Sequence, residues 1–282
     1  MRFDEEDDNG TRPFQNPFPK KRFGQHFLAD KNLIRKIVAS AGVAPGDRVL
    51  EIGPGRGALT EGLIEAGAQV TAIEVDRDLS RLLKERFPDD STLKVIEADA
   101  LKVSYAELSK AEGHRFKLVA NLPYNISGPI LARFLKEREA FTIMVLMFQK
   151  EVAERIASQP GTKSYGVLSV LSQAYTDVKI EFQVSRNLFS PRPKVDSSVV
   201  SFRVLDRPRV DIEDEAFFKT VVKSAFGTRR KTLLNSLKTL GFGKEGLIRA
   251  LEEAGVDPGR RGETLSLDEF GALAKALSKL TL

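Results

Sequence analysis

The stretch Val49-Leu50-Glu51-Ile52-Gly53-Pro54-Gly55-Arg56-Gly57 decides the fold. It begins as a short apolar run typical of a buried strand, and its glycines open an amphipathic helix expected over 58–66. Glycines at such a turn let a ligand approach the backbone closely. The stretch alone also permits a tight turn without a ligand, or a dinucleotide site, since Gly53, Gly55 and Ala58 satisfy G-x-G-x-x-A.

Strand and helix patterns alternate on the C-terminal side of this stretch. We expect strands over 48–52, 69–75, 93–98, 117–120 and 141–148, and helices over 58–66, 79–87 and 126–136. Short apolar strands separated by amphipathic helices favour an α/β fold with a doubly wound, mostly parallel sheet.

Beyond residue 205 only helical periods remain, over 217–225, 228–240, 246–254 and 267–280. This pattern predicts a small C-terminal all-helical domain. The expected organisation is a disordered tail over 1–20, a sheet domain over 21–206 and a helical domain over 207–282, with Arg207-Pro208-Arg209 as the linker.

Composition excludes several classes of function. The chain has no cysteine and two histidines, which rules out disulfides and thiolate sites, and we expect no metal. The longest apolar run, 141–148, is too short to span a bilayer, and an acidic N-terminus is unlike a secretion signal, so we expect a cytoplasmic protein. Residues 186–261 hold 16 Lys/Arg and 10 Asp/Glu, a net +6, which favours a nucleic-acid partner for the C-terminal part.

Two acidic residues follow the second and third expected strands. Glu74 is placed where a carboxylate accepts both hydroxyls of a ribose, which suits several nucleoside cofactors. Asp99 is placed to accept a hydrogen bond from an adenine amine, and it equally suits the N-cap of a short helix over 100–104. The glycine loop, Glu74 and Asp99 together match the pattern of residues by which class I methyltransferases bind S-adenosylmethionine.

The fourth expected strand ends in Asn121-Leu122-Pro123-Tyr124-Asn125-Ile126-Ser127. An adenine amine is a weak nucleophile because its lone pair is delocalised. The Asn121 side-chain oxygen and a backbone carbonyl at Leu122 or Pro123 can accept both N–H groups, and Tyr124 can stack on a flipped base. An Asn-Pro turn before a helix, with Tyr124 as packing, is the alternative.

Two further segments are expected to lie near the same cofactor and target-base site. Gln25-His26-Phe27-Leu28 precedes a helix expected over 31–39 and either covers the cofactor or simply leads into that helix. In Phe189-Ser190-Pro191-Arg192-Pro193-Lys194-Val195, Phe189 is a candidate second face of a base sandwich, and Arg192 and Lys194 are candidate phosphate contacts. A stiff edge connection explains the two prolines equally.

Taken together, these motifs resemble the bacterial small-subunit (16S) rRNA adenine dimethyltransferases from residue 21 to about residue 280. Gly24–Leu28, Glu51–Thr60, Ile73–Asp76, Ala98–Ala100, Asn121–Ser127, Phe189–Ser198 and Phe226–Lys231 carry the resemblance. Many relatives have Asn in place of His26 and Gln in place of Thr228.

The resemblance implies the cofactor, the site and the substrate. The cofactor contacts it implies are His26, Leu28, Gly53, Glu74, Asp99 and Asn121. Asn121, Tyr124 and Phe189 would handle the target base. It implies two methyl groups on each of two adjacent adenosines in a hairpin loop near the 3′ end of 16S rRNA, within an immature small subunit. We expect the protein to be a monomer.

The basic run Arg229-Arg230-Lys231 is expected at the start of the helix over 228–240, where its side chains and the helix N-terminus can meet phosphates. A solvated basic turn is the alternative. The rival functions are a large-subunit rRNA adenine methyltransferase, a DNA adenine methyltransferase, a non-catalytic assembly or transcription factor with this fold, and a nicotinamide-dependent dehydrogenase. Leu122 disfavours the DNA enzymes, whose loops usually carry two prolines.

Overall fold

The computed structural model describes residues 20, 25–88, 92–228 and 230–280. Nearly all of the tail expected over 1–20 lies outside these residues. The N-terminal half contains β1 (Phe27–Leu28), α1 (Lys31–Ser40), β2 (Arg48–Ile52), α2 (Ala58–Glu65), β3 (Gln69–Glu74), α3 (Arg77–Arg86), β4 (Leu93–Glu97), α4 (Tyr105–Glu112), β5 (Phe116–Asn121) and α5 (Ser127–Lys136). The rest contains β6 (Phe141–Gln149), α6 (Lys150–Ile156), α7 (Val167–Tyr175), β7 (Thr176–Val184), β8 (Phe189–Ser190), β9 (Ser197–Val204), α8 (Glu215–Phe226), α9 (Leu233–Leu237), α10 (Lys244–Glu253) and α11 (Leu267–Ser278).

A seven-stranded sheet forms the centre, in the order β4-β3-β2-β5-β6-β9-β7. The strands from β4 to β6 are parallel, and β9 and β7 extend the sheet with antiparallel pairing. From β2 the chain winds outward to β4 and then returns to β5 beside β2, so the winding direction reverses between these two strands. In open α/β sheets ligands bind in the crevice at such a reversal, outside the carboxyl ends of the strands.

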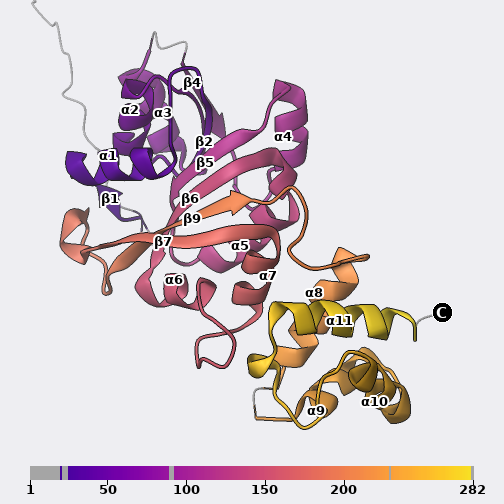
Figure 1. The fold of residues 1–282 in the computed structure, drawn as a ribbon. Helices are drawn as coiled ribbons and strands as arrows, with labels where there is room; N and C mark the ends of the chain where they lie inside the picture. The colour runs from indigo at the N-terminus through magenta and orange to yellow at the C-terminus, as the bar shows by residue number, and fades with distance from the viewer. Residues whose placement is uncertain (1–19, 21–24, 89–91, 229, 281–282) are drawn as a thin grey trace, which may run out of the picture.

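Two clusters of buried apolar side chains hold the layers together. Leu33 and Ile37 of α1 and Leu63 of α2 belong to the cluster on one face of the sheet. The cluster on the other face contains Phe134 of α5 and continues into the four C-terminal helices. Those helices lie at one end of the molecule, below the sheet in Figure 1. The mostly parallel sheet with apolar clusters on both faces agrees with the α/β fold predicted from the sequence.

Two local predictions differ from the structure, and one region has no predicted elements. The helix expected over 228–240 begins only at Leu233, because the described residues just before it form bends and a turn, so Arg230 and Lys231 do not lie on a helix. Asp99 caps a turn, not a helix over 100–104. The strands and helices between residues 149 and 205 had no predicted boundaries, since their apolar residues do not follow one clear period.

Candidate functional site

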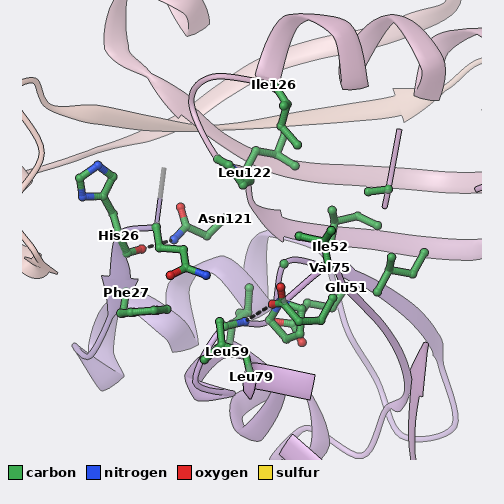
Figure 2. A pocket seen from close by; sticks show the side chains of 18 of the residues that line it. His26, Phe27, Glu51, Ile52, Leu59, Val75, Leu79, Asn121, Leu122 and Ile126 are labelled. Atoms are coloured by element: carbon green, nitrogen blue, oxygen red, sulfur yellow. Dashed lines mark hydrogen bonds between the residues drawn. The ribbon is translucent and has the colours of Figure 1, made fainter. Parts of the chain in front are cut away.

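A cleft of about 300 Å³ opens at the carboxyl edge of the sheet, beside the reversal point between β2 and β5. The glycine loop after β2, the ends of β3, β4 and β5, and the N-terminal segment 25–28 line it. Figure 2 shows side chains from these separate elements around one space. The structure therefore brings together the strand-end residues that the sequence placed at one edge.

Glu74 ends β3 and is 4 % exposed. Its carboxylate accepts hydrogen bonds from the backbone N–H groups of Gly55, at 3.2 Å, and Asp76, at 2.9 Å. Burial raises its pKa, while these backbone bonds act in the opposite direction. Glu74 is thus held rigidly against the glycine loop, as a group that must accept a ligand's hydroxyls requires.

Asp99 lies just beyond β4 and lines the cleft. Its Oδ1 atom accepts a hydrogen bond from the backbone N–H of Leu101, at 2.9 Å. Among the described residues no donor reaches Oδ2. The turn-capping role and the proposed ligand contact therefore use different oxygens of one carboxylate, and each is compatible with the other.

The glycine loop is shaped by close packing. Gly55 has φ +59°, and a Cβ there would come within 3.0 Å of the Phe27 ring. Gly57 has φ +81°, and a Cβ there would come within 2.8 Å of Leu83. The Arg56 guanidinium lies 4.5 Å from the centroid of the Phe27 ring. Both glycines are required by the local fold, because a side chain would displace β1 or α3.

The described N-terminal residues, Lys20 and the segment 25–28, are each tied to distant parts of the chain. Lys20 Nζ lies 2.6 Å from the carboxylates of Asp76 and Asp78. The His26 ring Nδ1 lies 2.7 Å from the backbone oxygen of Pro191, and β1 pairs with β8 in antiparallel register. Segments more than 160 residues apart in sequence thus form one small ribbon beside the site. His26 and Leu28 both line the cleft.

Asn121 is the last residue of β5. Its Nδ2 atom donates a hydrogen bond to the backbone carbonyl of His26, at 2.9 Å (Figure 2). Asn121 Oδ1 accepts no hydrogen bond from any described residue. The orientation of the amide is therefore fixed with its oxygen available as an acceptor.

The carbonyl groups that follow differ in availability. The Pro123 carbonyl accepts from the backbone N–H of Ile126, at 3.2 Å, whereas no donor among the described residues reaches the Leu122 carbonyl. The structure thus favours Leu122 over Pro123 as the second acceptor beside Asn121. Because Leu122 itself is buried, its side chain anchors this loop in the core.

Tyr124 combines an apolar and a polar anchor. Its hydroxyl lies 2.6 Å from Ser197 Oγ, and its ring centroid is 5.5 Å from that of His26. Burial raises the pKa of the Tyr124 phenol. The phenol therefore stays protonated in the neutral pH range, and the hydroxyl fixes the direction of a ring that lines the cleft.

The remaining candidate residues lie outside the cleft lining. Phe189 is 5 % exposed and packs in the apolar cluster with α1 and α2, so stacking on a base by Phe189 would need the 189–195 segment to move. Arg192 and Lys194 are exposed in that segment. Arg230 and Lys231 are exposed and come just before α9, a helix that lies at the end of the molecule away from the cleft strands (Figure 1). Arg229 lies outside the described residues.

Several residues in and around the cleft fall within the quoted motifs but were given no individual role by sequence reasoning. Val75 is 44 % exposed directly after Glu74 and offers an apolar surface, and Glu51 lies buried in the lining. Ser197 positions Tyr124 from β9, and Asp76 anchors Lys20. The position of Val75 and Asp76 beside a strand-end carboxylate was a usable signal, whereas nothing local indicates the Ser197 contact.

The cleft fits the donor that the resemblance implies. It joins a fixed carboxylate for a ribose, an open carboxylate oxygen for an adenine amine, and an apolar surface at Val75. Gly53, with φ +65°, has no neighbour closer than 4.0 Å to the position of a Cβ, so its backbone is open to a ligand. The described residues contain no group of His, Cys, Asp or Glu placed to hold a metal ion, and no helix among them is long and apolar enough to cross a membrane.

Comparison with known proteins gives one consistent family. A model of the family described as ribosomal RNA adenine dimethylase matches residues 18–279. A protein of Geobacter metallireducens named ribosomal RNA small subunit methyltransferase A is 48% identical over 264 residues, which cover 93% of this chain and 96% of the relative.

Two solved structures of similar fold are consistent with this family. A dimethyladenosine transferase from Plasmodium falciparum has a TM-score of 0.78 and 28% identity, covering 91% of this chain and 99% of the other. The 23S rRNA methyltransferase ErmE has a TM-score of 0.67 and 27% identity, covering 89% of this chain and 99% of the other.

Proposed function

The chain belongs to the ribosomal RNA adenine dimethylase family, and from this we propose that it dimethylates two adjacent adenosines in a hairpin loop near the 3′ end of small-subunit (16S) rRNA. It is an S-adenosylmethionine-dependent rRNA adenine-N6 methyltransferase. The observation that carries the proposal is Asn121, whose amide nitrogen is committed to the His26 carbonyl while its oxygen remains an acceptor.

The residues that would hold the donor are distributed over the cleft. Glu74 would accept the ribose hydroxyls, Asp99 Oδ2 the adenine amine, and the Gly53 backbone would lie against the methionine part. When bound, S-adenosylmethionine supplies an electrophilic methyl group on a sulfonium. His26 and Leu28, in the segment held by Pro191 and by the pairing of β1 with β8, would exclude water from that group.

The target loop would solve the chemical difficulty of an adenine amine. Its lone pair is delocalised into the ring, so the nitrogen must become more pyramidal before it can attack. Asn121 Oδ1 and the Leu122 carbonyl would accept the two N–H groups and favour that shape. Tyr124, held by Ser197, would stack on the flipped base. No strong base is required, because the proton becomes acidic once the nitrogen is alkylated.

The small subunit is favoured over the large subunit by the nearer relatives. The protein named for the small subunit is 48% identical, whereas the 23S enzyme is 27% identical. A non-catalytic assembly factor is disfavoured, because Glu74, Asp99, Asn121 and Tyr124 are all present and all line the cleft.

The RNA partner would be met outside the cleft. Arg192, Lys194, Arg230 and Lys231 are exposed, and with Arg229 they form the proposed phosphate contacts. We assign residues 21–206 to methyl transfer and 207–282 to docking on an immature small subunit. We further propose that the enzyme acts as a monomer and lies in the cytoplasm with its substrate.

Labelled methyl transfer tests this function. Immature small subunits, mature subunits, large subunits and naked 16S rRNA would each be incubated with the protein and labelled donor, and the modified bases mapped. We expect dimethylated adenosines at one adjacent pair in the immature small subunit. Label confined to large-subunit RNA, or no transfer to any RNA, would contradict the proposal.

A further inference from the structure

Glu51 is a buried carboxyl group in the cleft that the proposed reaction does not use. Its side chain is 1 % exposed and belongs to the cleft lining (Figure 2). Thr60 on α2 donates a hydrogen bond to Glu51 Oε2 at 2.7 Å. No described lysine, arginine or histidine forms an ion pair with it. A carboxylate that is buried with one neutral partner is costly, so this position needs an explanation.

The surroundings of Glu51 are defined on each side. From β3 the charged group that faces it is Glu74, which disfavours a second negative charge. From β5 its register neighbour is the apolar Val119, and from α2 the polar neighbour is Thr60. Burial, opposed by Thr60 and assisted by Glu74, raises the pKa of Glu51 to about 8. In the ligand-free protein at neutral pH the group therefore holds its proton.

The position of Glu51 in the sheet matters for the donor. Strand β2, which carries Glu51, lies between β3 and β5. Glu74 ends β3 and Asn121 ends β5. If these two hold the ribose and the target amine, as in the proposed function on which this inference rests, the sulfonium must lie between them. Glu51 is the carboxyl group on the strand in between.

We propose that Glu51 is a proton-linked specificity residue that makes the cleft prefer the cationic methyl donor to the uncharged product. Donor binding breaks the O–H bond of Glu51, the electron pair stays on the carboxylate that faces the cation, and the proton passes to solvent. After methyl transfer the sulfur carries no charge. Glu51 then takes one proton back from solvent, the favourable charge pair is gone, and the product is released.

Calorimetry tests this linkage without relying on turnover. S-adenosylmethionine and S-adenosylhomocysteine would each be titrated into the protein in buffers of different ionisation enthalpy, over roughly pH 6 to 9. At pH 7 we expect donor binding to release about one proton more than product binding. Donor affinity should rise with pH by up to about tenfold per unit and level off above the pKa of Glu51, while product affinity changes little.

Substitutions test whether the proton released on donor binding comes from Glu51. Glu51→Gln keeps an acceptor for Thr60 and should abolish both the extra proton release and the pH slope. The ammonium groups of the ligands titrate alike in both proteins, so the difference between them isolates Glu51. Thr60→Val removes the bond that favours the carboxylate, so it should move the rise in affinity to higher pH. Glu74→Gln should weaken donor binding but keep the rise of donor affinity with pH.

The outcomes separate this inference from the proposed function. Donor binding without extra proton release, or release that persists in Glu51→Gln, overturns the role of Glu51 alone. Should Glu51→Gln fail to fold, an unshifted pH profile in Thr60→Val would overturn it equally. A parent protein that does not bind the donor at all overturns the proposed function together with this inference.

Discussion

The side-chain nitrogen of Asn121 lies 2.9 Å from the backbone oxygen of His26, a residue 95 positions earlier in the chain. This bond joins the end of β5 to the N-terminal segment and determines which Asn121 atom is left for the substrate. Cofactor cover and target site are therefore not independent parts. A change of the Asn121 side chain should therefore affect both, whereas a substitution at His26 keeps the backbone acceptor.

Removing the Asn121 amide should nearly abolish methyl transfer. Asn121→Ala deletes the oxygen proposed to accept an adenine N–H and also frees the His26 carbonyl, so we expect turnover to fall by about 100-fold or more. Single-turnover methyl transfer to immature subunits measures the effect. Asn32→Ala, on the exposed face of α1, is the matched control and should keep parental activity. An Asn121→Ala enzyme with near-parental turnover would remove this residue from the mechanism.

Paired substitutions at Asp99 separate its two roles. Asp99→Asn keeps an oxygen for the Leu101 N–H but loses the charge, whereas Asp99→Ala loses both. A charge-assisted hydrogen bond is worth about 1.5 to 3 kcal/mol, so both variants should bind S-adenosylmethionine about tenfold or more weakly. Thermal unfolding should distinguish them, with only Asp99→Ala losing stability. Full affinity in Asp99→Asn would show that the carboxylate only caps the turn.

Glu74→Ala should reduce donor affinity at least as strongly, because Glu74 is also bonded to the Gly55 N–H in the glycine loop. Titration calorimetry with S-adenosylmethionine and with NAD checks the assignment. Tight NAD binding by the parent protein would favour the dehydrogenase interpretation instead.

Tyr124 offers a test of stacking against hydrogen bonding. Tyr124→Ala should lower both turnover and RNA affinity, whereas Tyr124→Phe should be mild because stacking uses the ring. Ser197→Ala removes the same hydroxyl contact from the other side, so it should resemble Tyr124→Phe. Methylation kinetics with the three variants decide the matter. Equal damage by Phe and Ala at position 124 would mean that the hydroxyl, not the ring, is needed.

The raised pKa of Glu51 predicts how stability changes with pH in the absence of ligand. The folded-state pKa is about 8, above the ordinary 4.5, so the folded protein holds a proton that the unfolded chain has lost. Its contribution is complete below about pH 4.5 and is lost as pH rises to about 8, by up to about 1.4 kcal/mol per unit. Chemical denaturation over roughly pH 5 to 9 should therefore show Glu51→Gln gaining stability relative to the parent as pH rises. If the difference in unfolding free energy between Glu51→Gln and the parent stayed constant with pH, Glu51 would not be protonated in the folded protein.

The basic turn before α9 makes a prediction about docking. Arg230 and Lys231 are exposed there, so replacing both with Ala should leave donor affinity unchanged and weaken binding to the small subunit. The dependence of this binding on salt should become shallower, by about 0.7 to 0.9 in slope for each phosphate that is no longer neutralised. Arg81 and Lys84, on the exposed side of α3, provide a matched double substitution without effect. Unchanged slope and affinity for the Arg230 and Lys231 variant would mean that this turn is merely solvated.

Local pattern was sufficient for much of the sheet. The expected strand over 48–52 and the expected helices over 58–66 and 126–136 match β2, α2 and α5 to within one residue at each end. Apolar runs bounded by glycine, proline and capping residues signal such elements because their burial depends on period alone. The helix expected over 228–240 fails at its start, because the apolar period there begins only with Leu233 and the preceding basic residues supply none.

By itself the sequence determined the α/β fold and the edge of the sheet where Glu74, Asp99 and Asn121 meet, because parallel strands place their carboxyl ends together. Only the tertiary structure decided the orientation of the Asn121 amide, the choice of the Leu122 carbonyl, the burial of Phe189 and the isolation of Glu51. Each of these depends on contacts between segments far apart in the chain, such as the pairing of β1 with β8. Local periodicity carries no record of such contacts, since they are set by how the packed layers bring distant backbone groups within hydrogen-bonding distance.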